Sequence, residues 1–434
     1  MTHATPDPLS DPPLVEDPAA VRPKSAVRRT VASIGIDTSP LRESREFRLL
    51  FAGQGVSFAG SMITYVAVPF QAFALTRSSL VVGLVSLAEL VPILLIAFVG
   101  GALADAFDRR AVVRLSELGL CAATVALLVN SALPHPRIWV LFIAVAFAAA
   151  ADAVQRPSLS ALVPRIISRD RLQAAVALES LRGNIGQVAG PPLAGVLIAA
   201  FGLPVTYGVD VASFAVSLAA LTFMRAVPPP PEAERVSVAA VRAGLAYAWK
   251  RQDLLGTYVV DINATFFGMP MALFPQIAAS LGGPAILGVM YTAPSVGALV
   301  ASLTSGWTRR VHRHGRAIAV AAGVWGAAII LFGFSETLWV ALLALAIAGA
   351  ADMVSGLFRL TIWNQTIPDA LRGRLAGVEM VSYTSGPALG NVEAGVVAAI
   401  AGVRASVVSG GVLCVLGTVA LSAALPRFWR YRAG

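Results

Sequence analysis

Apolar residues occur along the chain in long continuous runs separated by short polar connections. The runs lie near 49–76, 80–104, 111–133, 138–163, 172–200, 204–226, 254–280, 284–307, 317–335, 337–366, 374–401 and 404–426. A bilayer core about 30 Å thick needs roughly 20 apolar residues per helical span, since each residue rises about 1.5 Å. Because the runs do not alternate with polar positions, they indicate helices and not barrel strands. We therefore predict an all-α integral membrane protein with twelve transmembrane helices.

Composition and charge agree with this class. Of the 434 residues, 57% are hydrophobic and 13% are charged, whereas about a quarter are charged in soluble domains. Most of the basic residues precede the first run or lie in alternate connections, and the positive-inside rule then predicts that both termini are cytoplasmic. The basic residues behind the net charge of +9 are dispersed between helices and form no single patch. This distribution favours contact with anionic lipid headgroups over binding of nucleic acid.

The polar segments divide the chain into domains. Residues 1–44 are polar and rich in proline, without the apolar stretch of a signal peptide, and predict a disordered cytoplasmic tail. Residues 227–252 begin with a proline-rich stretch and then place Val238, Val241, Leu245, Ala248 and Trp249 at helical spacing, which predicts a cytoplasmic linker with an amphipathic helix. The expected six-helix bundles are 45–226 and 253–426, followed by a cytoplasmic tail at 427–434.

The two bundles carry an internal repeat. AAADAV at 149–154 matches GAADMV at 349–354, and PRIISRDRL at 164–172 matches PDALRGRL at 368–375. GQVAGPPLAG at 186–195 and SGPALG at 385–390 then share a Gly-Pro pair. Three matches in the same order indicate a duplication, and so predict two pseudo-symmetric halves.

The connection between the second and third runs reads GALADAFDRR. Its residues Gly101, Leu103, Asp105, Arg109 and Arg110 match the G-x-L-x-D-x-x-x-x-R/K motif of the major facilitator superfamily, which the chain resembles over 44–426. The resemblance implies secondary transport by alternating access, with Asp105 latching the halves at a cytoplasmic gate and the arginines pairing with acids on neighbouring helices. A solvated cationic loop is the alternative, and it is the interpretation favoured for GWTRRVHRHGR at 306–316, which lacks the aspartate.

The fifth helix is similar to the antiporter motif of the superfamily's exporters. Gly186, Gly190, Pro191 and Gly195 occupy the matching places, and the resemblance implies export; ordinary helix packing through small residues is the alternative. FRLLFAGQGVSFAGSM at 47–62 and VPFQAFALTRSSLVVGL at 68–84 resemble the branch that holds the enterobactin and macrolide exporters.

Acidic residues inside the apolar runs are the candidates for coupling, because a carboxylate in lipid costs several kcal/mol unless it is paired, protonated or hydrated. The candidates are Glu89, Asp152, Glu179, Asp210, Asp261, Asp352, Glu379 and Glu393. Glu89, Asp261 and Glu393 have no basic neighbour within one turn and are assigned to proton coupling or cation binding, unless they are exposed or pair with another helix.

The remaining acids have basic residues on the same helix. Asp152 with Arg156, and Asp352 with Arg359, are cavity charges or packing ion pairs, whereas Glu179 with Arg182 predicts a gate salt bridge. Phe266, Phe267, Met269, Tyr291 and Trp363 could line an apolar ligand cavity, with packing or lipid contact as the alternative.

Motifs of other function classes do not occur. The chain has no phosphate-binding GK[ST], no HExxH and no G-x-S-x-G, and Cys121 and Cys414 have no metal-ligand spacing. We therefore expect no enzyme, cofactor or metal. The expected function is proton-coupled efflux of a hydrophobic or amphipathic small molecule, of drug, macrolide or siderophore class, by a monomer in a bacterial cytoplasmic membrane. Uptake or facilitation on the same fold, and a non-transporting sensor, are the alternatives.

Overall fold

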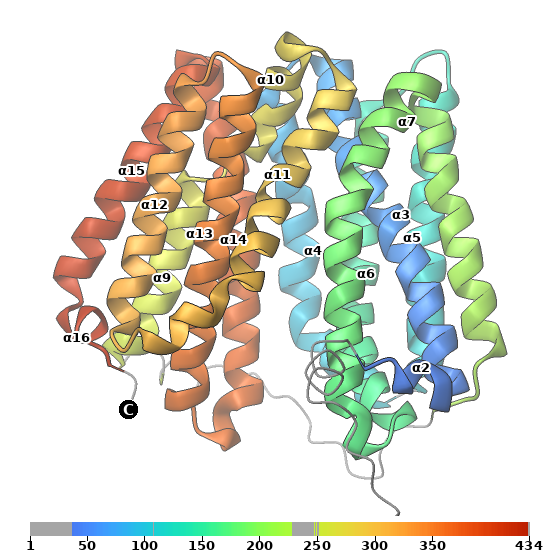
Figure 1. Cartoon of the computed structure of the whole chain (residues 1–434). Helices are drawn as coiled ribbons and strands as arrows, with labels where there is room; N and C mark the ends of the chain where they lie inside the picture. Colours follow the sequence, from blue (N-terminus) through green and yellow to red (C-terminus); the bar gives the residue numbers. More distant parts are fainter. Residues whose placement is uncertain (1–36, 107, 228–246, 248, 250, 433–434) are drawn as a thin grey trace, which may run out of the picture.

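The computed structural model describes residues 37–106, 108–227, 247, 249 and 251–432, without the side chains of 97–106, 369–374 and 376–378. In this part of the chain the elements are α-helices and short 3-10 turns, and no strand is found. The long helices stand side by side, with α2 and α16 at one end of the bundle and α10 at the other (Figure 1). We call these the terminal end and the far end.

The N-half, residues 37–227, contains the first six α-helices of the described residues. They are α2 (Ser39–Glu43), α3 (Arg45–Thr76), α4 (Ser79–Ala106), α5 (Arg109–Ala132), α6 (Ile138–Ile166) and α7 (Leu172–Phe223). The C-half, residues 247–432, contains the rest. They are α9 (Gln252–Phe267), α10 (Phe274–Leu281), α11 (Pro284–Leu303), α12 (His314–Phe334), α13 (Leu338–Thr366), α14 (Asp369–Ala401), α15 (Val403–Ala424) and α16 (Pro426–Trp429).

The helices agree with the twelve predicted runs. Among the described residues, ten helical segments are long and apolar enough to cross a membrane. One of them contains two predicted runs, because Gly202 in α7 adopts φ 78° and ψ 176° and so turns the chain at the far end. The run at 374–401 corresponds to α14, which is 33 residues long and is not among the ten.

Side chains at two helix starts explain where the chain turns at the terminal end. The Ser44 hydroxyl accepts a hydrogen bond from the Phe47 backbone N–H at 3.1 Å and donates to the Ile166 carbonyl at 2.9 Å. The Asp108 carboxylate accepts from the Ala111 N–H at 2.9 Å and caps α5. These caps satisfy backbone groups that a helix start leaves unpaired.

Glycines fix the register of the internal repeat. Gly186 and Gly190 of α7 approach Phe58 and Met62 of α3, while Gly386 and Gly390 of α14 approach Thr265 and Phe266 of α9. The two pairs are 200 positions apart. The turn glycines, Gly202 and Gly402, are separated by the same interval, and both have a positive φ.

This register corrects one sequence match. It places Gly386 opposite Gly186, so the Gly-Pro pair at 386–387 lies one helical turn before the position equivalent to Gly190 and Pro191. The sequence match rested on the presence of a Gly-Pro pair in each of the two helices. The contacts that define the repeat are made instead by glycine, where a Cβ would collide with the neighbouring helix.

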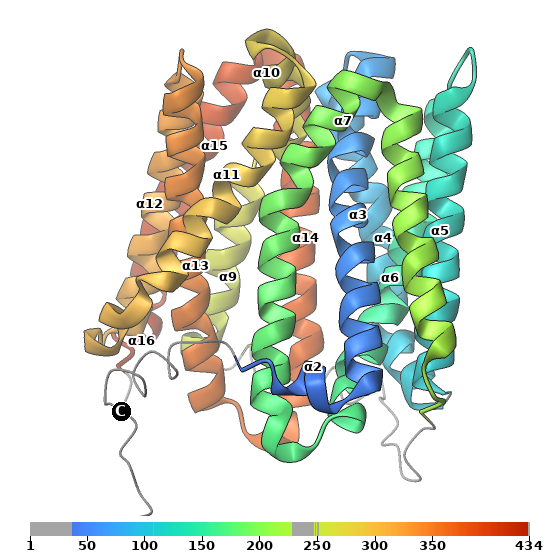
Figure 2. The ribbon, with the colours of Figure 1, turned by 45° about the vertical axis from the view of Figure 1, so that its right-hand side comes forward.

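The two halves pack together at the far end. Two helix pairs make the contact, α4 with α14 and α7 with α11 (Figures 1 and 2). A continuous hydrophobic core includes residues of both halves there, such as Ile63 and Ile198 with Leu287 and Met290. At the terminal end the N-half has a separate core around Phe47, Leu162 and Leu221. The halves are thus joined mainly at one end.

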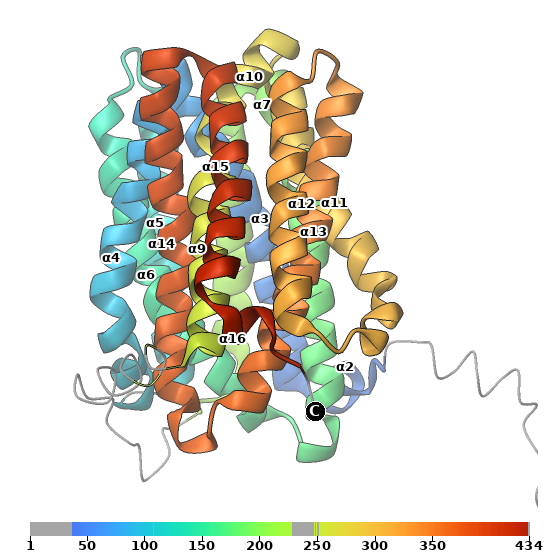
Figure 3. The same cartoon turned by 90° about the vertical axis from the view of Figure 1, so that its left-hand side faces the viewer.

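The predicted linker and its amphipathic helix lie largely outside the described residues. Of that segment, Tyr247 is placed with its hydroxyl donating to the Thr366 carbonyl at 3.0 Å, at the end of α13. The expected boundaries at 44, 226, 252 and 426 therefore stay predictions. Figure 3 shows α16 crossing below α9 and α12 at the terminal end, where Phe428 is fully buried.

Candidate functional site

Arg359 is the centre of a cluster of charges in the middle of the C-half. Its guanidinium forms an ion pair with Asp261 of α9 and lies 3.4 Å from Asp352, two turns earlier on α13. The side chains of Arg359 and Asp261 are only 12% and 8% exposed, whereas that of Asp352 is 51% exposed. Glu379 of α14 is a further electrostatic neighbour of Arg359. The sequence had left open whether Asp261 pairs with another helix, and the structure places it in such a pair.

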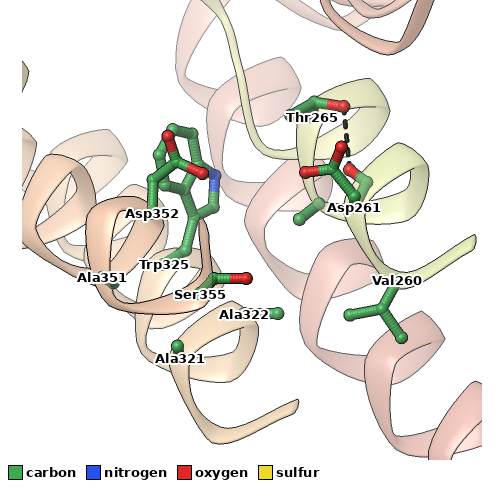
Figure 4. A pocket seen from close by; sticks show the side chains of 10 residues that line it. Val260, Asp261, Thr265, Ala321, Ala322, Trp325, Ala351, Asp352 and Ser355 are labelled. Atoms are coloured by element: carbon green, nitrogen blue, oxygen red, sulfur yellow. Dashed lines mark hydrogen bonds between the residues drawn. The ribbon is translucent and has the colours of Figure 1, made fainter. Parts of the chain in front are cut away.

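A small pocket adjoins this cluster. Figure 4 shows Asp261 and Asp352 projecting toward it from two helices, with Trp325 and Ser355 between them. Its volume is about 10 Å³, close to the lower limit for one water molecule. The Trp325 indole N–H donates to the Gly268 carbonyl at 2.7 Å, which fixes the ring. The site can thus hold one small polar group between two carboxylates.

The N-half presents charges at the matching depth. Arg156 and Asp152 of α6 form an ion pair at 2.6 Å, with side chains 64% and 29% exposed. Both are electrostatic neighbours of Tyr383 on α14, so they face the C-half. Glu89 of α4 is an electrostatic neighbour of Asp152, and no hydrogen bond or ion pair is described for its carboxylate.

Two carboxylates are buried among uncharged donors inside the N-half. Glu117 of α5 is fully buried and accepts hydrogen bonds from Gln54, from Ser57 at 3.2 Å and from Ser217 at 3.0 Å. Asp210 of α7 is 1% exposed. Its donors are the side chains of Thr64 at 2.5 Å, Thr124 at 3.3 Å and Ser213 at 3.1 Å.

Sequence reasoning named Asp210 but missed Glu117. Glu117 lies close to Arg114 at the beginning of its run, where an acid is easily taken for part of the solvated connection. The available signal was the spacing of Gln54 and Ser57 on α3 and of Asp210 and Ser217 on α7, which places polar side chains on one face of each helix.

The antiporter-type motif takes part in helix packing within the N-half and in packing between the two halves. Gly186 and Gly190 let α3 approach α7 within the N-half, whereas Pro191 and Gly195 contact α11 of the C-half. A Cβ on Gly195 would lie 2.7 Å from the Pro284 carbonyl oxygen, and one on Gly288 would lie 2.3 Å from that of Pro191. The motif therefore forms part of the far-end contact between the halves.

The same contact recurs between α4 and α14. A Cβ on Gly83 would lie 2.4 Å from the Asn391 carbonyl oxygen, and one on Gly395 would lie 2.7 Å from Leu80 Cα. Polar side chains add to the contact: the Asn391 amide donates to Ser86 at 3.1 Å, and beside it Ser79 of α4 donates to Gln276 of α10 at 2.6 Å. We call these α4–α14 and α7–α11 contacts the far-end seal.

The gate motif is described only in part. Gly101 and Leu103, like Asp105, lie in α4, and their side chains are outside the described part of the structure. Arg109 donates a hydrogen bond to the Ala161 carbonyl at 2.8 Å, and Arg110 donates to the carbonyls of Leu221 at 2.6 Å and Thr222 at 2.7 Å.

The expected pairing of the arginines with acids stays a prediction. The carbonyls are those near the ends of α6 and α7, where a helix C-terminus carries partial negative charge. The arginines thus fasten α5 to α6 and α7 inside the N-half. The latch assigned to Asp105 stays a prediction.

The predicted gate salt bridge forms within one half. Arg182 contacts Glu179 one turn earlier on α7 at 2.6 Å and donates to the Gln54 carbonyl of α3 at 2.9 Å. It also lies over the Phe58 ring, 5.8 Å from the centroid. In this conformation the pair fastens α7 to α3, and its role as a gate stays a prediction.

The residues expected to line a ligand cavity make packing contacts. Tyr291 packs edge to face with Tyr65 of α3, with ring centroids 5.4 Å apart, and so belongs to the contact between the halves. Trp363 stacks on Tyr258 at 5.5 Å. Phe266, Phe267 and Met269 do not line the pocket beside Asp261 and Asp352. Glu393 of α14 is half-buried, and no hydrogen bond or ion pair is described for it. Its assigned role in coupling stays a prediction.

Comparison with known proteins identifies the family. Residues 37–430 match the family described as transmembrane secretion effector. The chain is 27% identical over 385 residues to the enterobactin exporter EntS of Citrobacter koseri, covering 88% of this chain and 92% of that protein. It is 27% identical over 389 residues to EntS of Shigella boydii, covering 89% and 93%. These relatives are transporters and not enzymes.

Solved structures share the fold at low sequence identity. A POT family transporter in complex with 5-aminolevulinic acid superposes with a TM-score of 0.69 at 13% identity, covering 89% of this chain and 97% of that one. A bacterial homologue of the iron transporter ferroportin superposes with a TM-score of 0.65 at 15% identity, covering 87% and 99%. The family match, the relatives and the shared fold agree: this chain is a multi-pass membrane transporter that belongs to the transmembrane secretion effector family of the major facilitator superfamily.

Proposed function

We propose that this protein exports an amphipathic small molecule in exchange for protons, and that the carboxylates around Arg359 bind the proton. The observation that carries the proposal is that three carboxylates, Asp261, Asp352 and Glu379, share one guanidinium in the middle of the C-half. On the N-half side, Glu89, Asp152 and Arg156 bring the total to five carboxylates against two arginines. Excess negative charge in a low-dielectric region favours the binding of a proton or a cation.

Exchange requires that proton and ligand exclude one another. Asp352 is the exposed member of the Arg359 cluster, so a hydroxyl or ammonium group of a ligand can reach its carboxylate. A proton on that carboxylate removes both the charge and an acceptor site, and so weakens the bond to the ligand. By linkage, a bound ligand opposes protonation to the same extent, which is the thermodynamic basis of exchange.

The orientation predicted by the arginines gives the side from which the ligand has access in this conformation, and exchange for entering protons gives the direction of transport. With the terminal end in the cytoplasm and the far-end seal closed, the ligand enters from the cytoplasmic side and leaves after the halves rock about the site. The family description and the exporter relatives support export. Drugs, macrolides and catecholate siderophores are the ligand classes to screen.

Proteoliposomes with an imposed pH gradient test this proposal. Wild type is compared with Asp261→Asn and Asp352→Asn for movement of a cationic lipophilic dye, a macrolide and a catecholate siderophore. We expect gradient-driven transport by wild type and a loss of at least about tenfold in each variant, with ligand binding retained in Asp261→Asn and weakened in Asp352→Asn. The matched control is Glu336→Gln, which removes a carboxylate that is 84% exposed in the α12–α13 connection.

Three outcomes would contradict the proposal. Wild-type transport at a rate independent of the pH gradient would exclude proton coupling and favour facilitated diffusion. Ligand movement in the same direction as the proton favours uptake. Equal loss of transport in Glu336→Gln and Asp352→Asn would show that the Arg359 cluster has no special role.

A further inference from the structure

An apolar groove lies on the outer surface of the C-half near the terminal end. It is formed by one face of α12 and one face of α13, and its volume is about 570 Å³, within the range of about 300–1,000 Å³ typical of small-molecule sites. Val320, Val324 and Ile347 line it and are 60%, 43% and 38% exposed. Val320 and Val324 belong to α12, which packs against α9, α13, α15 and α16 of its own half. We therefore infer that their exposed surfaces face the acyl chains of the bilayer.

Positive charge lines the groove on the terminal side. Arg313 and Arg316 are the charged residues of its lining, at the beginning of α12. Neither has an acidic partner among the described residues, and the Arg316 Nε is buried without a hydrogen-bond partner. The Arg316 guanidinium lies over the Trp429 ring, 5.2 Å from the centroid, which orients it. Trp307, 47% exposed, stands beside them, as tryptophan does at membrane interfaces.

The apolar lining and the two arginines together indicate which ligand the groove binds. An apolar channel along two membrane helices fits an acyl chain, and two unpaired guanidinium groups where the helices begin fit a phosphate. We propose that the groove binds one anionic phospholipid, with its phosphate at Arg313 and Arg316 and an acyl chain between α12 and α13. A phospholipid is the occupant favoured here because charge and apolar surface are arranged in the same order as in a leaflet, headgroup outward and chain inward.

The bound lipid contacts the wall of the carboxylate pocket. Ala321 and Ala351 line both the groove and the small pocket beside Asp261 and Asp352. A chain in the groove presses on these two alanines from outside, in an interior that is close-packed and transmits displacement. The lipid thereby supports the side of the C-half on which Asp352 lies.

Lipid titration of the purified protein tests the site without using transport. Native mass spectrometry in detergent measures binding of phosphatidylglycerol and of phosphatidylcholine with the same acyl chains. We expect the double variant Arg313→Gln/Arg316→Gln to lose about thirtyfold in affinity for phosphatidylglycerol, since each basic residue contributes about a factor of five. The matched control is Arg309→Gln/Arg310→Gln, an equal change of charge on exposed residues of the preceding 3-10 turn that do not line the groove; we expect less than about threefold.

A third variant tests the acyl chain. Val324→Phe fills the groove at a position already 43% exposed, so the fold is retained, and we expect weaker binding of both lipids. Equal affinity of wild type for the two lipids would overturn the proposal, as would equal losses in the two arginine pairs. Unchanged binding in Val324→Phe, or glycerol 3-phosphate binding as tightly as the lipid, would place the phosphate on the surface and the acyl chain outside the groove.

Discussion

At the scale of single residues, the buried carboxylates are stabilised in two different ways. Asp261 has a guanidinium beside it, whereas Glu117 accepts hydrogen bonds from an amide and two hydroxyls. A buried ion pair becomes strongly destabilising when only one partner is removed, because a charge is left without compensation. A carboxylate among uncharged donors leaves those donors unsatisfied when it is removed. The two sites therefore respond differently to substitution.

The pair of Arg359 with Asp261 gives the larger effect. We expect Arg359→Gln to destabilise the protein by about 3–5 kcal/mol, and the double variant Asp261→Asn/Arg359→Gln to recover most of this loss. Thermal unfolding in detergent measures both. As a control, Arg156→Gln breaks a pair that is largely exposed, and it should cost no more than about 1 kcal/mol. A double variant as unstable as the single one would contradict the expectation.

Glu117 is expected to tolerate an amide better than an apolar side chain. Glu117→Gln keeps one hydrogen-bond acceptor for Ser57 or Ser217. Glu117→Leu removes every acceptor at this position, so the two hydroxyls and the Gln54 amide lose their partner. We expect Glu117→Leu to lower stability by about 1–3 kcal/mol relative to Glu117→Gln, measured by the same unfolding assay. Equal melting temperatures of the two variants would mean that the hydrogen bonds contribute little.

The sequence showed that charges were present but not how they were paired. Asp352 and Arg359 share a helix, so their proximity followed from helical spacing. Asp261 is almost a hundred residues from Arg359, and only the packing of α9 against α13 brings them together. Glu89 was expected to have no basic neighbour on its own helix, and no partner from another helix is described for it.

At the scale of elements, α7 and α14 each contact two neighbours through glycine. Each places one pair of glycines against the first long helix of its own half, α3 or α9, and a further glycine against a helix of the opposite half, α11 or α4. The helices themselves were predictable, because a run of about 20 apolar residues has few other stable structures in lipid. The helix pairing was not, since a glycine in sequence does not reveal which helix approaches it.

The far-end seal should open when a methyl group is added at Gly195. In Gly195→Ala the new Cβ would lie 2.7 Å from a backbone oxygen of α11, so the halves must separate there. Gly208→Ala, also on α7, has nothing within 4 Å and is the matched control. With Cys121 and Cys414 replaced, a cysteine at Ser79 reports the opening through its reaction with a membrane-impermeant maleimide. We expect faster labelling in Gly195→Ala than in Gly208→Ala, and identical rates would contradict the steric argument.

At the scale of the whole molecule, two halves related by a 200-residue repeat meet at one end of the bundle. The repeat was visible in sequence at 149–154 and 349–354, and the structure extends it to contacts between the halves. The orientation of the bundle in the membrane stays a prediction of the positive-inside rule, because basic residues gather at the terminal end, as at the beginning of α5 and in η3 (Ser305–Arg310).

Reporter fusions measure this orientation. Green fluorescent protein fused after Gly434 should fluoresce, and alkaline phosphatase inserted in the α5–α6 connection at residues 133–137 should be active, because that connection lies at the far end. With the two reporters exchanged, alkaline phosphatase after Gly434 should be inactive, and green fluorescent protein at residues 133–137 should not fluoresce. The reverse pattern would place the terminal end outside the cytoplasm and invert the proposed direction of transport.

The composition of the far-end seal has a consequence for the evolution of ligand range. The close approaches in the seal are made by glycine and backbone atoms, while the charged cluster consists of other residues, on α9, on α13 and at Glu379 of α14. Substitutions among the charged residues therefore leave the packing surfaces of the far-end seal unaltered. Ligand selectivity can change by single mutations without opening an uncoupled path through the transporter. Duplicated copies of such a gene are free to diverge toward different cargoes while inheriting one gating mechanism.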